Sequence, residues 1–182
     1  PDINESLENF TMVADQKIRF GLGAVKNVGT NIVQAVIEAR KTGGKFTSLT
    51  DFADRVHHKD FNKKSLESLI KCGALDDLGE RNRMLGNLDT LLDYNRETQR
   101  VKSGGQTDLF SLTPNIQLAS LKLREVEAAA KRERLGWEKE LLGLYITEHP
   151  LEEYAAKLQA NRMLPLKNLT KDLRNQIVAV GG

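Results

Sequence analysis

The sequence predicts a mainly α-helical protein with one small β-hairpin near its N-terminus. Apolar residues recur at helical spacing in several stretches, and Ile32, Val33, Val36 and Ile37 are an example. Aromatic residues make up only 5% of the 182 residues, whereas charged residues make up 29%. The only clear β element before the C-terminus lies at 10–20, where two short alternating stretches flank a polar break.

A glycine-bearing turn joins a short expected helix over 22–26 to a longer one that begins at Thr30. Gly29 lets the backbone turn with little steric cost, and Thr30 is the expected N-cap. Free N–H groups at a helix N-terminus beside Lys26 suit a phosphate oxygen. The pattern is typical of a helix-hairpin-helix that binds DNA without reading its sequence. The expected DNA contacts are Lys26, Asn27, Val28, Gly29 and Thr30.

A second unit of similar construction follows. Asn62 is a good N-cap for a helix whose apolar positions include Leu66, Leu69 and Ile70. A turn at 71–74 then leads into a short segment that ends at Gly79. Two such units could contact both strands of a duplex. The expected contacts of the second turn are Lys71, Cys72, Gly73 and Ala74.

The remaining chain divides by composition. Further helices are expected at 48–56 and 82–100, so that a tandem hairpin domain covers 1–102. Residues 103–120 contain two adjacent glycines and a proline, which favours an exposed linker. A helical connector is expected over 121–175, with helices at 122–144 and 151–158, and a strand begins near Gln176 within a last segment, 176–182.

One peptide in the expected linker has a sequence that indicates binding to a partner protein. Leu109 and Phe110 are neighbouring large apolar side chains on an exposed segment, which indicates that a partner's pocket binds them. The expected partner-binding peptide is Gln106, Thr107, Asp108, Leu109 and Phe110. A chance pentamer is the alternative.

Charge and motifs limit the function classes. The net charge is only +2, which favours a light phosphate contact through amides and a few lysines, or no nucleic acid at all. The single cysteine, Cys72, excludes an intrachain disulfide. No P-loop, serine elbow or metal-ligand spacing is present, so we expect neither catalytic residues nor a metal site. A DNA-repair module and a protein-interaction scaffold without DNA binding remain alternatives.

Seven ordered blocks resemble the C-terminal part of the alpha (catalytic) subunit family of bacterial DNA polymerase III. They are PDINES, IRFGLGAVKNVG, AVIEAR, GGKFTSLTDF, NKKSLESLIKCGALDDLG, QTDLF and WEKELLGLYITEHPLEEY. The resemblance implies a tandem helix-hairpin-helix domain that holds duplex DNA, and a strand from Ile177 that opens an OB-fold domain. It also implies that Gln106, Leu109 and Phe110 bind the sliding clamp, although Thr107 stands where strong clamp peptides have leucine.

The resemblance further implies that the chain is a piece of a larger DNA-directed DNA polymerase, a nucleotidyltransferase. The polymerase aspartates, and the Mg²⁺ that the parent enzyme uses, would then lie outside this chain, which would hold no cofactor. The implied partners are double-stranded DNA, the sliding clamp (beta subunit) and other replisome subunits. The implied location is the bacterial cytoplasm at the nucleoid, with no membrane partner.

Overall fold

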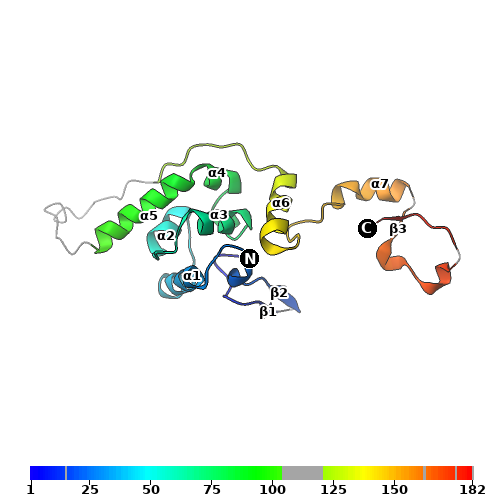
Figure 1. Ribbon diagram of the computed structural model, residues 1–182, viewed down its shortest axis with the longest axis horizontal. Coiled ribbons are helices and arrows are strands. Elements are labelled where there is room, and N and C mark those ends of the chain that lie inside the picture. Colours follow the sequence, from blue (N-terminus) through cyan, green and yellow to red (C-terminus); the bar gives the residue numbers. More distant parts are fainter. Residues whose placement is uncertain (15, 104–120, 162, 175, 182) are drawn as a thin grey trace. The chain divides into compact units, whose positions relative to one another are not determined.

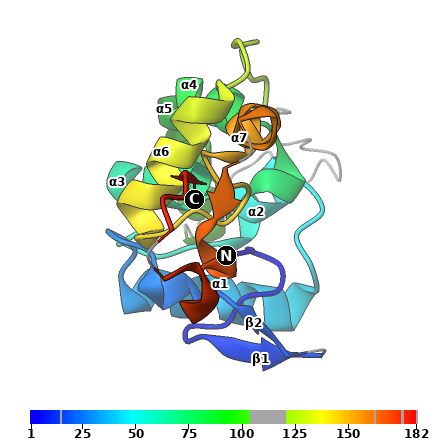
Figure 2. The same cartoon turned by 90° about the vertical axis from the view of Figure 1, so that its right-hand side faces the viewer.

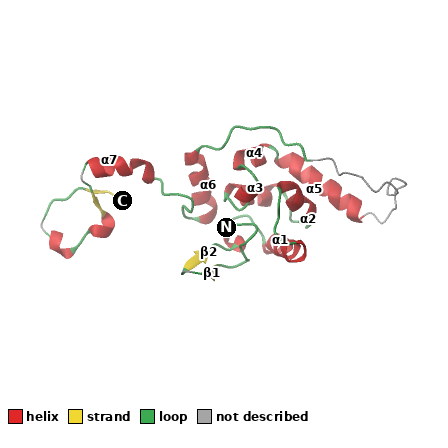
Figure 3. Cartoon of the chain, turned by 180° about the vertical axis from the view of Figure 1, so that it is seen from behind, coloured by secondary structure: helices red, strands yellow, loops and turns green. Residues whose placement is uncertain are grey.

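The computed structural model describes residues 1–14, 16–103, 121–161, 163–174 and 176–181. Helices dominate the described chain, and its strands form two short pairs (Figure 3). The chain divides into two compact units, Pro1–Leu144 and Tyr145–Gly182. The expected mainly α class with a small N-terminal β-hairpin is confirmed. The expected connector 121–175 is instead shared between the two units, because residues 121–144 pack with the first.

The N-terminal hairpin consists of β1 (Thr11–Val13) and β2 (Lys17–Arg19), which pair in antiparallel orientation. Met12 lies opposite Ile18, and both side chains are exposed. Just beyond the paired residues, the rings of Phe10 and Phe20 pack edge to face with centroids 4.5 Å apart. These cross-strand contacts stabilise a two-stranded ribbon that would be marginal alone.

Three helices follow, and their ends obey local capping chemistry. α1 (Thr30–Gly43) ends at Gly44, whose φ of +75° glycine adopts without strain. α2 (Leu49–Arg55) begins after Ser48, whose side chain accepts the N–H of Asp51. α3 (Lys63–Lys71) begins after Asn62 with a reciprocal capping box to Ser65. The expected N-cap role of Asn62 is confirmed.

The single helix expected over 82–100 is two helices, α4 (Arg81–Gly86) and α5 (Leu88–Ser103). Asn87 separates them, and its side chain pairs with the backbone of Arg124 in both directions: Nδ2 donates to Arg124 O (3.0 Å) and Oδ1 accepts the Arg124 N–H (2.8 Å). The Asn87 side chain thus bonds both backbone groups of Arg124, as the backbone of a neighbouring β-strand would. Sequence periodicity could not reveal this break, because its cause lies far along the chain.

The helix expected from Lys122 is also shorter than predicted. Residues 121–130 run without regular secondary structure along α4 and Asn87, and only Lys131–Leu142 form a helix, α6. A Cβ at Gly86 would lie 2.7 Å from a methyl group of Val126, so glycine permits this close approach. Tertiary packing has here overridden a local preference for helix.

One hydrophobic core holds the first unit together, and Figures 1 and 2 show the helices around it. α2 packs against α5, while α3 contacts α4, α5 and α6. Within the core, the Phe52 ring packs edge to face with Phe46 (centroids 5.2 Å apart) and at a tilt with Phe61 (5.8 Å). Each fully buried Leu or Ile contributes about 1.5–3 kcal/mol. The fully buried large apolar side chains include Ile3, Leu22, Ile32, Leu66, Leu69, Ile70, Leu75 and Leu91.

The second unit has few elements. A 3₁₀ turn (Glu152–Tyr154) leads into α7 (Ala155–Ala160), and β3 (Leu164–Pro165) pairs in parallel with β4 (Val180–Gly181). The OB-fold start expected at 176–182 stays a prediction. The expected linker lies outside the described residues except for Ser103. None of the described helices has the length and apolar character that crossing a membrane requires.

Candidate nucleic-acid interface

The first hairpin, which we define as residues 25–30, follows a single 3₁₀ turn (Leu22–Ala24) rather than the expected helix over 22–26. Asn27 adopts the left-handed conformation, with φ of +65°. Its side-chain Nδ2 donates to Ser68 Oγ of α3 (3.3 Å), which supports this unusual backbone. Val28 is buried, whereas Lys26, Asn27 and Gly29 are exposed. The hairpin is therefore anchored by two buried apolar side chains, Val25 and Val28, and presents its tip to solvent.

The N-terminus of α1 is open. Gly29, not Thr30, is the N-cap, with an ordinary extended conformation (φ −78°, ψ 154°) and no capping side chain. The expected cap role of Thr30 is wrong because Thr30 is already the first helical residue. In the part of the chain that the structure describes, no protein acceptor bonds the N–H groups of Gly29, Thr30 and Asn31. A Cβ at Gly29 would meet nothing within 4 Å.

The turn at 71–74 behaves differently from the prediction. The Gly73 N–H donates to Ile70 O and the Ala74 N–H to Leu69 O (both 3.0 Å), with φ of +81° at Gly73. This is the Schellman arrangement that ends a helix. The Cys72 N–H donates to Ser68 O, and the Cys72 and Ala74 side chains are buried. The expectation that Cys72, Gly73 and Ala74 offer free N–H groups to an anion is therefore wrong.

The structural counterpart of the first hairpin lies a few residues later. Residues 75–80, which we call the acidic turn, lead into α4 as 25–29 lead into α1. A short sequence repeat marks this correspondence, and the prediction for 71–74 overlooked it: GAVKNVG at 23–29 recurs as GALDDLG at 73–79. The repeat replaces Lys26 and Asn27 by Asp76 and Asp77, so the two turns have opposite charge.

The acidic turn is closed by its own carboxylate. Glu80 caps α4 and accepts the N–H groups of Arg83 (2.7 Å) and Ala129 (2.9 Å). Burial by itself would raise the pKa of Glu80, but the hydrogen bonds from Ala129, Arg83 and Asn82 outweigh it and lower that pKa. The position that an anion would take at this helix end is thus already filled.

Lys71, the remaining predicted contact of the second turn, lies within a set of protein contacts. Its Nζ is 2.6 Å from Glu67 Oε1 and lies 5.6 Å from the centroid of the Trp137 ring. Lys26, in contrast, is exposed at the first hairpin. The structure therefore brings Lys26, Asn27, Gly29 and Thr30 together at one exposed surface. The turn at 71–74 differs, because its N–H groups at 72–74 are already bonded within the protein.

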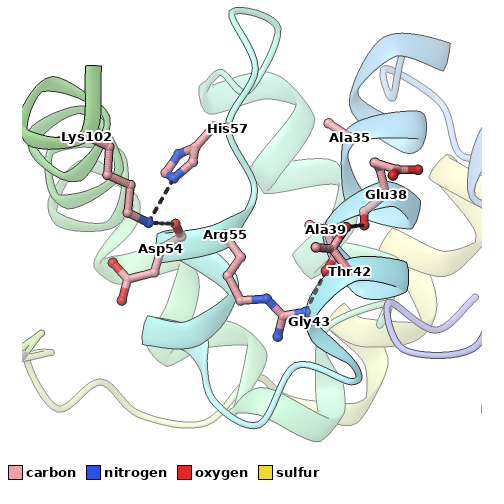
Figure 4. A pocket seen from close by; sticks show the side chains of 9 residues that line it. All are labelled: Ala35, Glu38, Ala39, Thr42, Gly43, Asp54, Arg55, His57 and Lys102. Carbon is pink, nitrogen blue, oxygen red and sulfur yellow. Dashed lines mark hydrogen bonds between the residues drawn. The ribbon is translucent and has the colours of Figure 1, made fainter. Parts of the chain in front are cut away.

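A pocket of about 560 Å³ lies elsewhere, between α1, α2 and the end of α5 (Figure 4). Lys102 Nζ donates to the backbone O of Asp54 (2.6 Å) and lies 3.4 Å from His57 Nε2. Burial, and secondarily the charge of Lys102, lowers the pKa of His57. The described residues contain no group of three or more His, Cys, Asp or Glu side chains arranged to hold a metal ion. The predicted partner peptide, 106–110, lies outside the described residues.

The family model described as "Helix-hairpin-helix motif" matches residues 1–85, which include both the first hairpin and the acidic turn. The chain is homologous to a segment of the alpha subunit of bacterial DNA polymerase III. It is 36% identical over 184 residues to the Vibrio cholerae DNA polymerase III subunit alpha, and the match covers 100% of this chain and 16% of that protein. The Borreliella burgdorferi subunit is 38% identical over 189 residues, with 100% and 16% covered.

The relative from Thermus aquaticus, also a DNA polymerase III subunit alpha, is 40% identical over 154 residues, covering 85% of this chain and 12% of the relative. The chain therefore spans only a small part, 12–16%, of these relatives.

Proposed function

We propose that the first hairpin binds a phosphate of duplex DNA. The carrying observation is the open N-terminus of α1, where the N–H groups of Gly29, Thr30 and Asn31 stand free beside exposed Lys26. A helix of 14 residues places the positive end of its dipole at the same point. Membership of this region in the helix-hairpin-helix class supports the proposal.

Such a contact is independent of base sequence, since main-chain donors and a lysine reach phosphate oxygens and no base edge. Few phosphates are neutralised, so affinity is modest and falls with salt along a shallow slope. The net charge of +2 fits this light contact. A replicative enzyme that must move along its product gains from weak, non-specific holding.

We further propose that the parent protein is a replicative DNA-directed DNA polymerase of the bacterial cytoplasm that works with other replisome subunits. Homology to DNA polymerase III alpha subunits favours this over the DNA-repair alternative. Nucleotidyl transfer and the Mg²⁺ it requires would then belong to the parts of the parent outside residues 1–182. The residues described above would hold duplex rather than perform chemistry.

Clamp docking is the second part of the proposal. Leu109 and Phe110 would fill an apolar pocket on the sliding clamp, with Gln106 bonded at its edge, and Thr107 keeps affinity modest. Tethering to a ring around the same duplex makes the weak hairpin contact effectively intramolecular. Leu109→Ala with Phe110→Ala should abolish binding to the purified clamp and leave duplex affinity unchanged. Clamp binding that survives the double substitution rules the peptide out.

The test of the hairpin is Gly29→Asp. The extended backbone of Gly29 suits an N-cap aspartate, so the variant should fold while its carboxylate takes the anion's place, as Glu80 does at α4. Affinity for a 20-base-pair duplex should fall at least about tenfold. Thr90→Asp is the matched control, because Thr90 is exposed in the first turn of α5 and the substitution adds the same negative charge. Equal binding by both variants would overturn the proposal, and binding with no salt dependence would favour a scaffold.

A further inference from the structure

Helix α6 contacts the first hairpin and Arg81, the residue that directly follows the acidic turn. Near its C-terminal end, Leu141 O accepts the backbone N–H of Lys26 in the first hairpin (3.1 Å). One turn earlier, Glu138 Oε1 accepts from Nη1 (3.2 Å) and Nη2 (3.1 Å) of Arg81, which opens α4 directly after the acidic turn. α6 packs on α3, which lies between these sites in sequence (Figures 1 and 2).

The contact at the acidic turn has a specific geometry. The side chains of Arg81 and Glu138 are 4% and 1% exposed. Arg81 also binds Asp76 with both prongs, Nε to Oδ1 (2.8 Å) and Nη2 to Oδ2 (2.7 Å), and donates to Lys71 O (3.0 Å). A buried guanidinium that is satisfied on every side tolerates only one placement of its partners. Glu138 is therefore held in one position, and α6 with it.

The acidic turn also holds the approach to α6. The second oxygen of Glu80, Oε1, accepts the N–H of Ala129, just before α6 begins at Lys131. The carboxylates Asp76 and Glu80 thus face protein groups through the bonds given above. The acidic turn is thus linked to the segment 129–138 directly through Glu80 and Ala129, and indirectly through Asp76, whose partner Arg81 also bonds Glu138.

The contact at the first hairpin uses a backbone carbonyl at the C-terminal end of α6. α6 ends at Leu142, and Gly143 follows with φ of +80°. Leu141 is among the last four residues of the helix, whose carbonyls lack an intrahelical donor. The Lys26 N–H supplies that donor, directly before the left-handed Asn27. The end of α6 thereby fixes the backbone that enters the phosphate-binding turn.

We propose that the acidic turn does not bind phosphate but positions α6, and that α6 in turn holds the first hairpin in its anion-binding conformation. The first unit then grips the duplex backbone through one hairpin, and Glu138 is a positioning residue for it. This inference rests on the proposed DNA contact of the first hairpin. It adds that the contact depends on a helix far along the chain.

The test compares Glu138→Gln with Glu140→Gln in the full 182-residue chain. Both remove one negative charge from α6, but Glu140 is exposed. Trp137, the single tryptophan, lies on α6 and reports its docking through acrylamide quenching. Glu138→Gln should increase quenching, speed hydrogen exchange at the Lys26 N–H, and weaken duplex binding about 3- to 30-fold. Glu140→Gln should change none of the three.

A second variant decides the inference even if Glu138→Gln folds poorly. Asp77→Lys reverses an exposed charge of the acidic turn, and it should change duplex affinity less than about threefold at 0.15 M salt, because the turn does not meet phosphate. A gain of about tenfold or more would show that the acidic turn faces DNA and would overturn the inference. Unchanged Lys26 exchange and duplex affinity in a folded Glu138→Gln would do the same. Loss of binding in Gly29→Asp with no effect of Glu138→Gln refutes only the inference, whereas normal binding by Gly29→Asp refutes the proposed function.

Discussion

The carboxylate of Glu138 lies 3.1 Å from the guanidinium of Arg81, although 57 residues separate the two in sequence. The pair joins α6 to the start of α4 in a place that water does not reach. Desolvation by itself would lower the pKa of Arg81, but the bonds and charges of Asp76 and Glu138 outweigh it and raise that pKa. Such a pair selects one arrangement of helices more than it adds stability.

Arg81→Ala should destabilise the first unit by about 3–5 kcal/mol, because it removes the buried guanidinium that the buried Glu138 carboxylate binds. Denaturation by urea, followed through Trp137 fluorescence, measures this. Arg81→Met combined with Glu138→Leu should recover most of the loss, since no charge then stays buried. Arg96→Ala removes an exposed ion pair with Asp93 and should cost less than about 0.5 kcal/mol. A small effect of Arg81→Ala would mean that the pair is not buried in solution.

Gly73→Ala should destabilise the protein clearly more than Gly29→Ala does. Gly73 has φ of +81°, and a Cβ there would collide with the guanidinium of Arg81. Gly73→Ala should therefore cost about 1–2 kcal/mol for the left-handed backbone alone, and more as Arg81 is displaced. Gly29→Ala meets open space at an ordinary φ, so it should cost only the N-cap preference for glycine over alanine, about 0.5–1 kcal/mol. Thermal denaturation of both variants tests the contrast; equal losses would contradict it.

Cys72 should be chemically silent in the native protein. Burial raises the pKa of its thiol to about 11, so little thiolate exists at pH 8 and reagents cannot reach it. Alkylation by iodoacetamide should be at least about a hundredfold slower than in urea. Thr42→Cys places a thiol on the exposed end of α1 and should react at an ordinary rate. Rapid native modification of Cys72 would show that the turn at 71–74 opens readily.

Glu80 should make stability pH-dependent in the acid range. Its pKa is lowered from 4.5 in the folded protein, so its contribution is complete above that value and is lost as pH falls through the folded pKa. Glu80→Gln should cost about 0.5–2 kcal/mol at pH 7, and this cost should shrink as pH falls through the folded pKa of Glu80, because the wild-type carboxylate then becomes protonated. Urea denaturation over a series of pH values below 4.5 measures the difference. The exposed Glu97→Gln on α5 serves as control, and a pH-independent effect of Glu80→Gln would contradict the assignment.

Local sequence determined much of the fold. The alternation at 10–20 predicted the β-hairpin, the periodicity after Gly29 predicted α1, and Asn62 predicted the start of α3. Each of these signals acts over a few residues, through side-chain period or a cap, and so can be recognised without knowing the fold. The glycine turn beside Lys26 was recognised for the same reason, although Asn27 rather than Gly29 carries the left-handed conformation.

Only the tertiary structure determined where α4 ends, where α5 and α6 begin, and which of the two turns keeps its N–H groups free. Asn87 divides α4 from α5 because it pairs with Arg124, and that pairing holds 121–130 out of the expected helix. The repeat at 73–79 resembles the first hairpin in sequence, yet Glu80 fills one helix end while Gly29 leaves the other free. The physical reason is common to these cases. A backbone N–H or carbonyl takes whichever partner the fold brings nearest, and a partner from a distant segment leaves no periodic trace beside it in the sequence.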